Sequence, residues 1–152
     1  MTTVKLKLSE VLQLEAEING ISNTQTQEVL LKGLISEKLK IKTKYWLAEL
    51  SKSIAEESKA INALRDETIK KYADLDEEGK GGIPLYINEV KDASGKVISG
   101  DINPKFTAFQ EEFNSLLAVE KEFKVFEFKL NDFENVETDA SYQVFFKLVS
   151  PE

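Results

Sequence analysis

The 152-residue chain contains neither cysteine nor histidine. Without cysteine no disulfide framework can form, which fits a protein that works in a reducing compartment. Zinc sites lose their usual ligands when both residue types are missing, and a serine or cysteine triad loses its imidazole base. Acid–base chemistry would rest on carboxylates, lysines and tyrosines alone, so we expect a protein that is not an enzyme and binds no cofactor or metal.

Long apolar runs are missing as well. No stretch approaches the roughly 18 apolar residues of a membrane-spanning helix, so we expect no membrane partner. Residues 1–8 have no apolar block followed by small residues, and no signal peptide is predicted. The apolar content of 41% and the charged content of 31% are typical of a folded protein. We predict one domain over residues 1–152, with a hinge at 76–82 between a helical N-terminal half and an α+β C-terminal half.

Charge is plentiful but uneven along the chain. Residues 29–71 hold ten Lys or Arg and six Asp or Glu, a net of +4, and the rest holds ten and twenty-one, a net of −11. The middle segment is therefore suited either to nucleic acid or to an acidic partner, whereas the remainder repels nucleic acid. The simpler interpretation is an ordinary solvated helix face, whose exposed charges contribute little to stability.

The apolar pattern predicts an α+β fold, in which three helices, one of them long, pack with a small, mostly antiparallel sheet. Residues 4–8 alternate between apolar and polar types, as a half-buried strand does. Ser9 is then placed to cap a helix that runs to about Asn19 and stops at Gly20.

A long helical segment is predicted in the middle of the chain. Residues 24–27 are expected to form a capping box and residues 29–39 to be helical, and a break or bend is expected near residues 41–43. One helix over Thr43–Asp74 would be about 48 Å long, which exceeds what one small core can cover. Its apolar seam consists of Leu47, Leu50, Ile54, Ile61 and Leu64.

The second half of the chain predicts a hairpin, a helix and two strands. Residues 83–90 are expected to form an edge strand because of Pro84, and residues 97–98 to pair back on it. The pair Asn103-Pro104 is typical of a helix start. All nine phenylalanines follow, from residue 106 onward; those up to Leu117 are expected to form one helix face. Strands are predicted at Val125–Leu130 and Tyr142–Leu148.

Residues 38–46 carry lysine at alternate positions and end in two aromatic residues. Lysines contact phosphates and aromatic rings stack on bases, which makes this segment the best candidate for a nucleic-acid contact. However, lysines two apart on a helix do not share a face, and the net charge is acidic. We therefore interpret Trp46 as a core anchor with a solvated rim, and do not expect nucleic acid as a partner. The residues are Lys38, Lys40, Lys42, Lys44, Tyr45 and Trp46.

Two segments resemble those of small uncharacterised proteins encoded by tailed bacteriophages. They are Lys42–Leu47, which opens a long helix, and Asn103–Phe106, which opens another that leads into an acidic, strand-rich tail. The resemblance covers about half of the chain and carries no catalytic signature. It implies a virion structural protein or an assembly accessory, located in the host cytoplasm or in the virion.

We therefore expect a non-enzymatic interaction protein that forms homo-oligomers or binds virion proteins. Its apolar seam would pack in part on the helix of residues 106–117, and either the exposed remainder or the strand of residues 83–90 would contact another subunit. The partner-binding residues would be Lys40, Lys42, Lys44, Tyr45, Trp46, Leu47, Leu50, Ile54, Ile61 and Leu64.

Two other functions stay open at this point. One is a small acidic inhibitor of a host nucleic-acid enzyme, in which residues 74–78 and 131–139 imitate the charge of nucleic acid. The other is a carboxylate-based, metal-dependent hydrolase, which would need acids that converge around a cation. Its candidate acids are Glu111, Glu112, Asp132, Glu134 and Asp139.

Overall fold

The computed structural model describes residues 1–136 and 142–151. These residues form two compact units, and each is described by itself. Unit 1 comprises Met1–Ala60 and Ala118–Glu152, and unit 2 comprises Ile61–Leu117. Three α-helices and a set of two-stranded sheets make up the described part, so the α+β prediction is confirmed.

The sheet of unit 1 joins the start of the chain to a segment more than a hundred residues later. Strand β1 (Thr2–Lys7) pairs antiparallel with β8 (Glu120–Val125) along its whole length. The predicted alternation is present, because Leu6 on β1 and Phe123 and Val125 on β8 are buried while their neighbours within the two strands are exposed.

Helix α1 (Leu8–Asn19) follows β1 without a loop. It begins before Ser9, so the predicted serine cap is wrong. The carboxylate of Glu10 instead accepts the Lys7 backbone N–H at 2.9 Å. The predicted end is confirmed, since Gly20 follows Asn19 with a φ of 82° that glycine adopts without strain.

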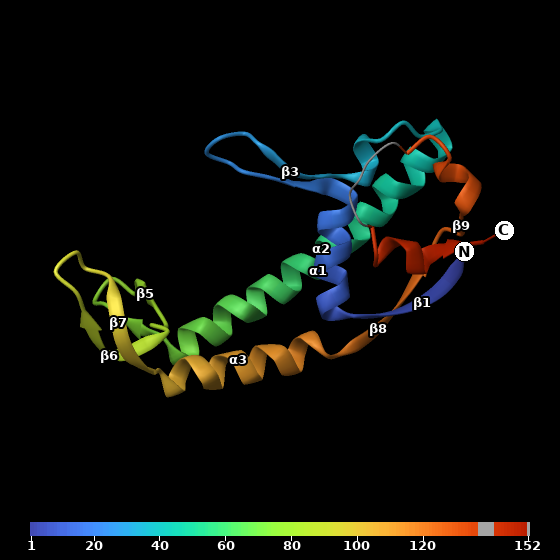
Figure 1. The fold of residues 1–152 in the computed structure, drawn as a ribbon. Coiled ribbons are helices and arrows are strands. Elements are labelled where there is room, and N and C mark those ends of the chain that lie inside the picture. Colours follow the sequence, from blue (N-terminus) through green and yellow to red (C-terminus); the bar gives the residue numbers. More distant parts are fainter. Residues whose placement is uncertain (137–141, 152) are drawn as a thin grey trace. The chain divides into compact units, whose positions relative to one another are not determined.

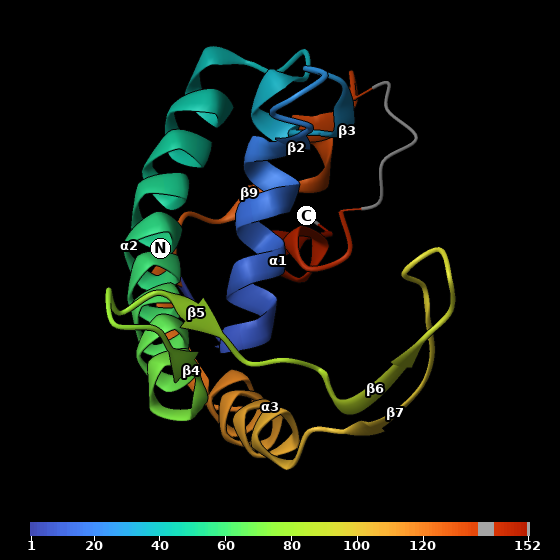
Figure 2. The ribbon, with the colours of Figure 1, turned by 90° about the vertical axis from the view of Figure 1, so that its left-hand side faces the viewer.

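Helix α2 (Ile41–Tyr72) is the predicted long helix; it begins at Ile41, at the expected break or bend, and is continuous from there to Tyr72 (Figure 1). Its first part belongs to unit 1 and its part from Ile61 onward to unit 2. Within unit 1 it lies beside α1 (Figure 2), and the Ser51 hydroxyl donates to the Asn19 side chain at 3.0 Å. The core of unit 1 includes Leu8, Val11, Leu14, Ile18, Leu34, Leu47, Leu50, Ile54, Phe128 and Phe145.

The predicted helix at residues 29–39 is wrong. Strand β3 (Val29–Lys32) pairs with β2 (Gly20–Ser22), and a short 3-10 turn, η1 (Leu34–Ser36), follows. The reason is the close approach of two backbones: a Cβ on Gly33 would lie 2.4 Å from the carbonyl carbon of Asn19.

The capping box expected at residues 24–27 is also wrong. The Asn23 side-chain oxygen accepts the backbone N–H groups of Gln25 and Thr26, at 2.9 and 3.2 Å. An asparagine turn therefore takes the place of a helix start.

The C-terminal segment of unit 1 is mostly helical turns, so the strand predicted at Tyr142–Leu148 is wrong. A 3-10 turn, η3 (Phe145–Leu148), buries Phe145 and Leu148, which lie three residues apart on one side of it. Around it lie η2 (Leu130–Phe133) and the parallel pair of β9 (Phe128–Lys129) and β10 (Val149–Ser150).

Unit 2 begins with the last turns of α2 and continues through two hairpins to a helix. The predicted hairpin is confirmed in kind, although β6 (Tyr86–Lys91) starts later than residue 83 and β7 (Val97–Ile102) is longer than two residues. Helix α3 (Pro104–Leu117) begins as predicted, with the Asn103 side chain accepting the Lys105 N–H at 3.1 Å. The other hairpin pairs β4 (Asp74–Leu75) with β5 (Gly81–Gly82).

The hinge proposed at residues 76–82 lies inside unit 2, in the turn and second strand of the β4–β5 hairpin. The Asp76 side chain orders this turn by accepting the backbone N–H groups of Glu78 and Lys80, at 3.0 and 2.8 Å. The two compact units divide elsewhere, after Ala60 and after Leu117. The hinge therefore stays a prediction.

Candidate functional site

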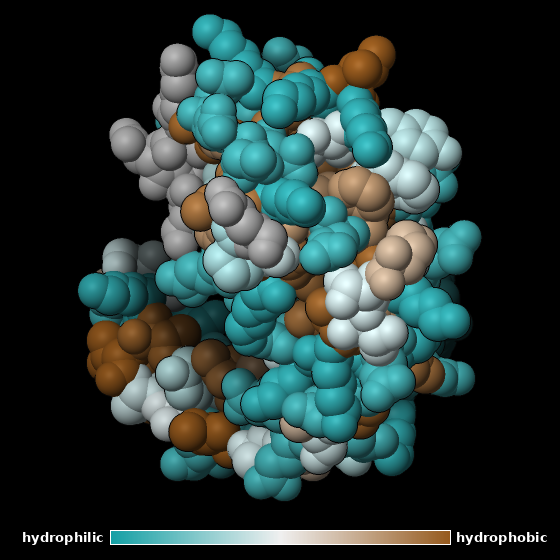
Figure 3. All heavy atoms as spheres, turned by 90° about the vertical axis from the view of Figure 1, so that its right-hand side faces the viewer, coloured by the Kyte–Doolittle hydropathy of each residue, from teal (hydrophilic) through white to brown (hydrophobic). Residues whose placement is uncertain are grey.

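The face of the molecule drawn in Figure 3 is mostly hydrophilic, with apolar atoms exposed in several separate places. Three exposed surfaces of the described residues are rich in apolar, aromatic or lysine side chains. Unit 1 carries an apolar pocket and an aromatic–lysine patch, and unit 2 carries an apolar hairpin.

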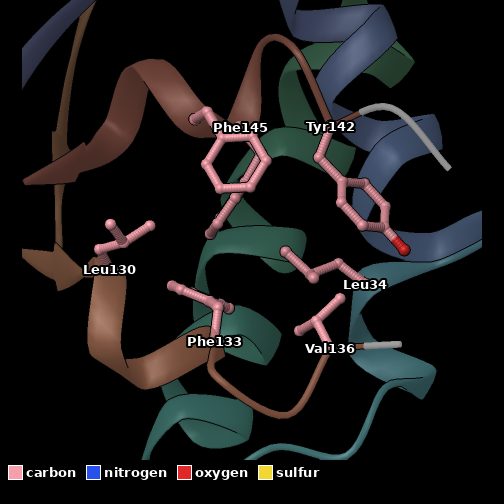
Figure 4. A pocket seen from close by; sticks show the side chains of 7 residues that line it. Leu34, Leu130, Phe133, Val136, Tyr142 and Phe145 are labelled. Atoms are coloured by element: carbon pink, nitrogen blue, oxygen red, sulfur yellow. The ribbon is translucent and has the colours of Figure 1, made fainter. Parts of the chain in front are cut away.

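The apolar pocket has a volume of about 240 Å³ and opens on unit 1. In Figure 4 the side chains of Leu34, Val136 and Phe145 point toward a common space. Aromatic pairs stiffen its wall, because the Phe133 and Phe145 ring centroids lie 5.3 Å apart. Such a pocket is suited to an apolar side chain rather than to acid–base chemistry. Its lining residues are Leu34, Leu130, Phe133, Val136, Tyr142, Phe145 and Phe146.

Two buried carboxylates hold the C-terminal segment in place. The backbone N–H of Val144 donates to Glu17 Oε1 at 2.9 Å, and burial raises the pKa of Glu17 although these hydrogen bonds oppose the shift. Glu37 lies 3.4 Å from Lys32 Nζ and 3.4 Å from the Tyr142 hydroxyl. Because each carboxylate already has protein partners, we interpret both as structural.

The aromatic–lysine patch lies at the start of α2. Trp46 is half-buried, and its ring stacks on Phe126 with centroids 4.8 Å apart and planes within 3°. Tyr45 meets Trp46 edge-on at 5.1 Å and leaves 56% of its surface exposed. Lys42 Nζ lies 5.9 Å from the Phe126 ring centroid, within reach of a cation–π contact. The sequence indicated the first two rings and the lysines but missed Phe126, which lies eighty residues away from Trp46 along the chain.

The lysines of this patch divide between two sides of the helix start. Lys38, Lys40 and Lys44 line an open hollow of about 540 Å³ together with Leu39 and Asn135. Lys42 lies on the other side, over Phe126. This division follows from helical geometry, because residues 40 and 44 are one turn apart and residue 42 is not.

The predicted apolar seam of α2 divides between the two units. Leu47, Leu50 and Ile54 are buried in unit 1, where they form core rather than a free surface. In unit 2, Ile61 is buried but Leu64 leaves 44% of its surface exposed. Helix α3, the expected packing partner, belongs to unit 2 and has no buried side chain; Phe109 and Phe113 stack along it at 5.9 Å.

The apolar hairpin of unit 2 is exposed along both strands. Every residue of β6 and β7 is exposed. Within residues 61–117, all of which the structure describes, Ile61 is the only buried apolar residue. The large apolar side chains of the hairpin, with Leu85 just before it, leave between 38% and 63% of their surface exposed: Leu85, Tyr86, Ile87, Val90, Val97, Ile98 and Ile102.

The carboxylates named as catalytic candidates are engaged elsewhere or lie apart in the chain. Glu112, in unit 2, accepts from the Tyr72 hydroxyl at 2.7 Å and pairs with Lys71 at 3.1 Å, and these partners lower its pKa. Asp132, in unit 1, accepts the Lys129 N–H at 3.1 Å. Asp139, with the end of the acidic segment 131–139, lies outside the described residues. In the described part of the chain, no three acids gather in a way that would hold a metal ion.

Comparison with known proteins does not indicate what these surfaces bind. No protein-family model matches the chain, and neither a curated protein nor a solved structure does. Within residues 1–136 and 142–151, none of the helices has the length and hydrophobicity needed to cross a bilayer.

Proposed function

We propose that the protein is a non-enzymatic assembly protein, which uses unit 2 to bind another protein chain. The observation that carries the proposal is the exposure of the apolar hairpin in a unit with a single buried apolar residue. An isolated two-stranded hairpin is marginally stable in water, and contiguous exposed apolar patches mark interaction surfaces.

The composition of the hairpin favours protein as the partner. Strand β7 carries Ile98 and Ile102, each of which leaves 63% of its surface exposed. Strands β6 and β7 form a two-stranded sheet, so each leaves an outer edge without a strand partner in unit 2. A second chain could add a strand at such an edge and cover the apolar side chains at once. Covering the exposed part of each apolar side chain would contribute about 1 kcal/mol to the free energy of binding.

Light scattering of the full chain over a hundredfold range of concentration tests this proposal in its simplest form, self-association. We expect the mean mass to rise with concentration. The double substitution Ile98→Thr/Ile102→Thr, which keeps β-branched residues in the strand, should shift that rise to higher concentration by at least tenfold.

The matched control is Ile21→Thr/Val29→Thr, because both residues are exposed on paired strands of unit 1. It should leave the mass profile unchanged. A chain that is monomeric at every concentration and captures no other protein through the hairpin would contradict the proposal, as would equal effects of the two variants.

The biological setting that we propose is a phage particle or its assembly. This part of the proposal is supported only by the resemblance of Lys42–Leu47 and Asn103–Phe106 to tailed-phage proteins. Mass spectrometry of particles purified from cells that express the gene with its genomic neighbours tests it. A virion component should be present in stoichiometric amounts, and an accessory should be present in assembly intermediates; absence from both would contradict it.

A further inference from the structure

We propose that the aromatic–lysine patch of unit 1 binds single-stranded nucleic acid. The inference is separate from the role of unit 2 and rests on the side chains that the structure gathers around the start of α2. These are Lys38, Lys40, Lys42, Lys44, Tyr45, Trp46, Lys124 and Phe126.

The local charge around the start of α2 favours an anionic ligand. Residues 38–46 contain four lysines and no acid. Among the described residues, none of the four lies within 4 Å of a carboxylate, whereas lysines elsewhere, such as Lys5, Lys52 and Lys105, are paired. Lys38, Lys40 and Lys44 line one hollow and Lys42 lies on the other side of the helix start, so the described residues give this end of α2 a local positive charge on a chain whose net charge is acidic.

Aromatic rings lie next to these lysines. Trp46 and Phe126 form a parallel stack, and Tyr45 stands exposed beside it. The stack also borders a hollow of about 220 Å³ that Lys124 and Glu49 line. The carboxylate of Glu49 is paired with Lys52 at 2.8 Å, so it opposes a bound phosphate less than a free acid would.

Together these features favour a nucleic acid over an acidic peptide. A peptide made of acidic residues alone would use the lysines and leave the rings without a partner, whereas every nucleotide of a single strand offers a phosphate to the lysines and an unstacked base to the rings. A duplex keeps its bases stacked and would use the lysines alone. The net charge of −7 predicts weak, salt-sensitive binding confined to this patch.

The test uses the only tryptophan of the chain as its reporter. Because Trp46 lies in the patch, its fluorescence should be quenched when a thymidine 20-mer binds the full protein at 50 mM salt. A labelled 20-mer measured by fluorescence anisotropy gives the affinity and its dependence on salt. A polyglutamate chain of similar charge and a matched DNA duplex are titrated in parallel.

Two variants separate the charge from the rings. Lys40→Gln/Lys44→Gln should weaken binding about tenfold and reduce the salt slope by about 1.4, from two lost phosphate contacts. Tyr45→Ala should weaken binding about tenfold through lost stacking. The matched control, Lys59→Gln/Lys70→Gln, removes two exposed lysines further along the same helix, neither of which pairs with a carboxylate of the described residues, and should change neither quantity. Circular dichroism checks that every variant is folded.

Four results would overturn the inference. They are no binding of the 20-mer at 50 mM salt, an equal loss with the control variant, no change on Tyr45→Ala, and polyglutamate or duplex binding as tight as that of the single strand. The last result would assign the patch to acidic proteins or to polyanions in general.

Discussion

At the scale of single residues, Glu17 shows how a polar group can hold apolar segments together. It leaves 2% of its surface exposed on α1, yet its carboxylate accepts the backbone N–H of Val144 from the far end of the chain. Burial disfavours the charged form, whereas the hydrogen bond favours it, and the net effect is a raised pKa. The residue therefore fixes the position of the C-terminal segment and imposes a penalty when ionised.

The pH dependence of stability should reveal that penalty. The pKa of Glu17 lies above its ordinary value of 4.5 in the folded protein, so between the two values the folded state binds more protons than the unfolded state. Its contribution to the free energy of unfolding therefore falls as pH rises through this window and levels off above the folded pKa.

Glu17→Gln keeps an oxygen that accepts from Val144 and removes the titration. Urea unfolding of both proteins from pH 4 to pH 8 should show the variant gaining stability relative to the original chain as pH rises above 4.5. A difference that is constant across this range would mean that Glu17 titrates normally in the folded state.

A second residue, Gly33, tests a backbone contact rather than a charge. A Cβ at this position would lie 2.6 Å from the Gly20 nitrogen and 2.4 Å from the Asn19 carbonyl carbon, so the β2–β3 pair would have to shift. Gly33→Ala should lower the free energy of unfolding by about 1–3 kcal/mol. Gly82→Ala, with open space around it, is the control and should change stability little; equal values would show that the β2–β3 pair relaxes freely.

At the scale of elements, the short turn η3 contributes more to the core than its length suggests. Phe145 lies 5.2 Å from the Phe128 ring and 5.3 Å from the Phe133 ring, measured between centroids, and is fully buried. Its neighbour Phe146 leaves 49% of its surface exposed. Two consecutive phenylalanines therefore have different roles, because a helical turn points them in different directions.

This difference gives a matched pair of substitutions. Phe145→Ala removes a buried ring from an aromatic cluster and should lower the free energy of unfolding by about 3–5 kcal/mol. Phe146→Ala removes an exposed ring at the rim of the apolar pocket and should cost about 1 kcal/mol or less. Thermal and urea unfolding measure both; similar losses would mean that η3 is not anchored as described.

Sequence patterns predicted elements well where local chemistry decides the outcome. The start of α3 at Asn103-Pro104, the stop of α1 at Gly20 and the length of α2 all follow from capping and periodicity. The predictions failed at residues 29–39 and 142–148, where contacts with distant residues decide. Gly33 meets Asn19 and Val144 meets Glu17, and neither contact has a local signal.

The same limit applies to the candidate site. Tyr45, Trp46 and the lysines are visible as a local motif, but their neighbour Phe126 is not. The predicted seam residues Leu47, Leu50 and Ile54 form part of the core of unit 1, since an apolar stripe looks the same whether it packs within its own chain or against another.

At the scale of the whole molecule, the two units differ in how many of their apolar residues they bury. Unit 1 buries aromatic and aliphatic side chains from both ends of the chain, whereas in unit 2, all of which the structure describes, Ile61 is the only buried apolar residue. A unit with so little core gains stability when another surface covers it, as hydrophobic burial is the main favourable term in folding and association. The exposed hairpin is therefore central to the proposed role in assembly.

Hydrogen–deuterium exchange of the β6–β7 backbone, followed as a function of protein concentration, tests that role most directly. If another chain covers the hairpin, its amides should exchange rapidly in dilute protein and become protected as the mass measured by light scattering rises, while the amides of α1 stay protected throughout. Hairpin amides that are equally protected in the monomer, or equally unprotected in the assembled form, would contradict the account.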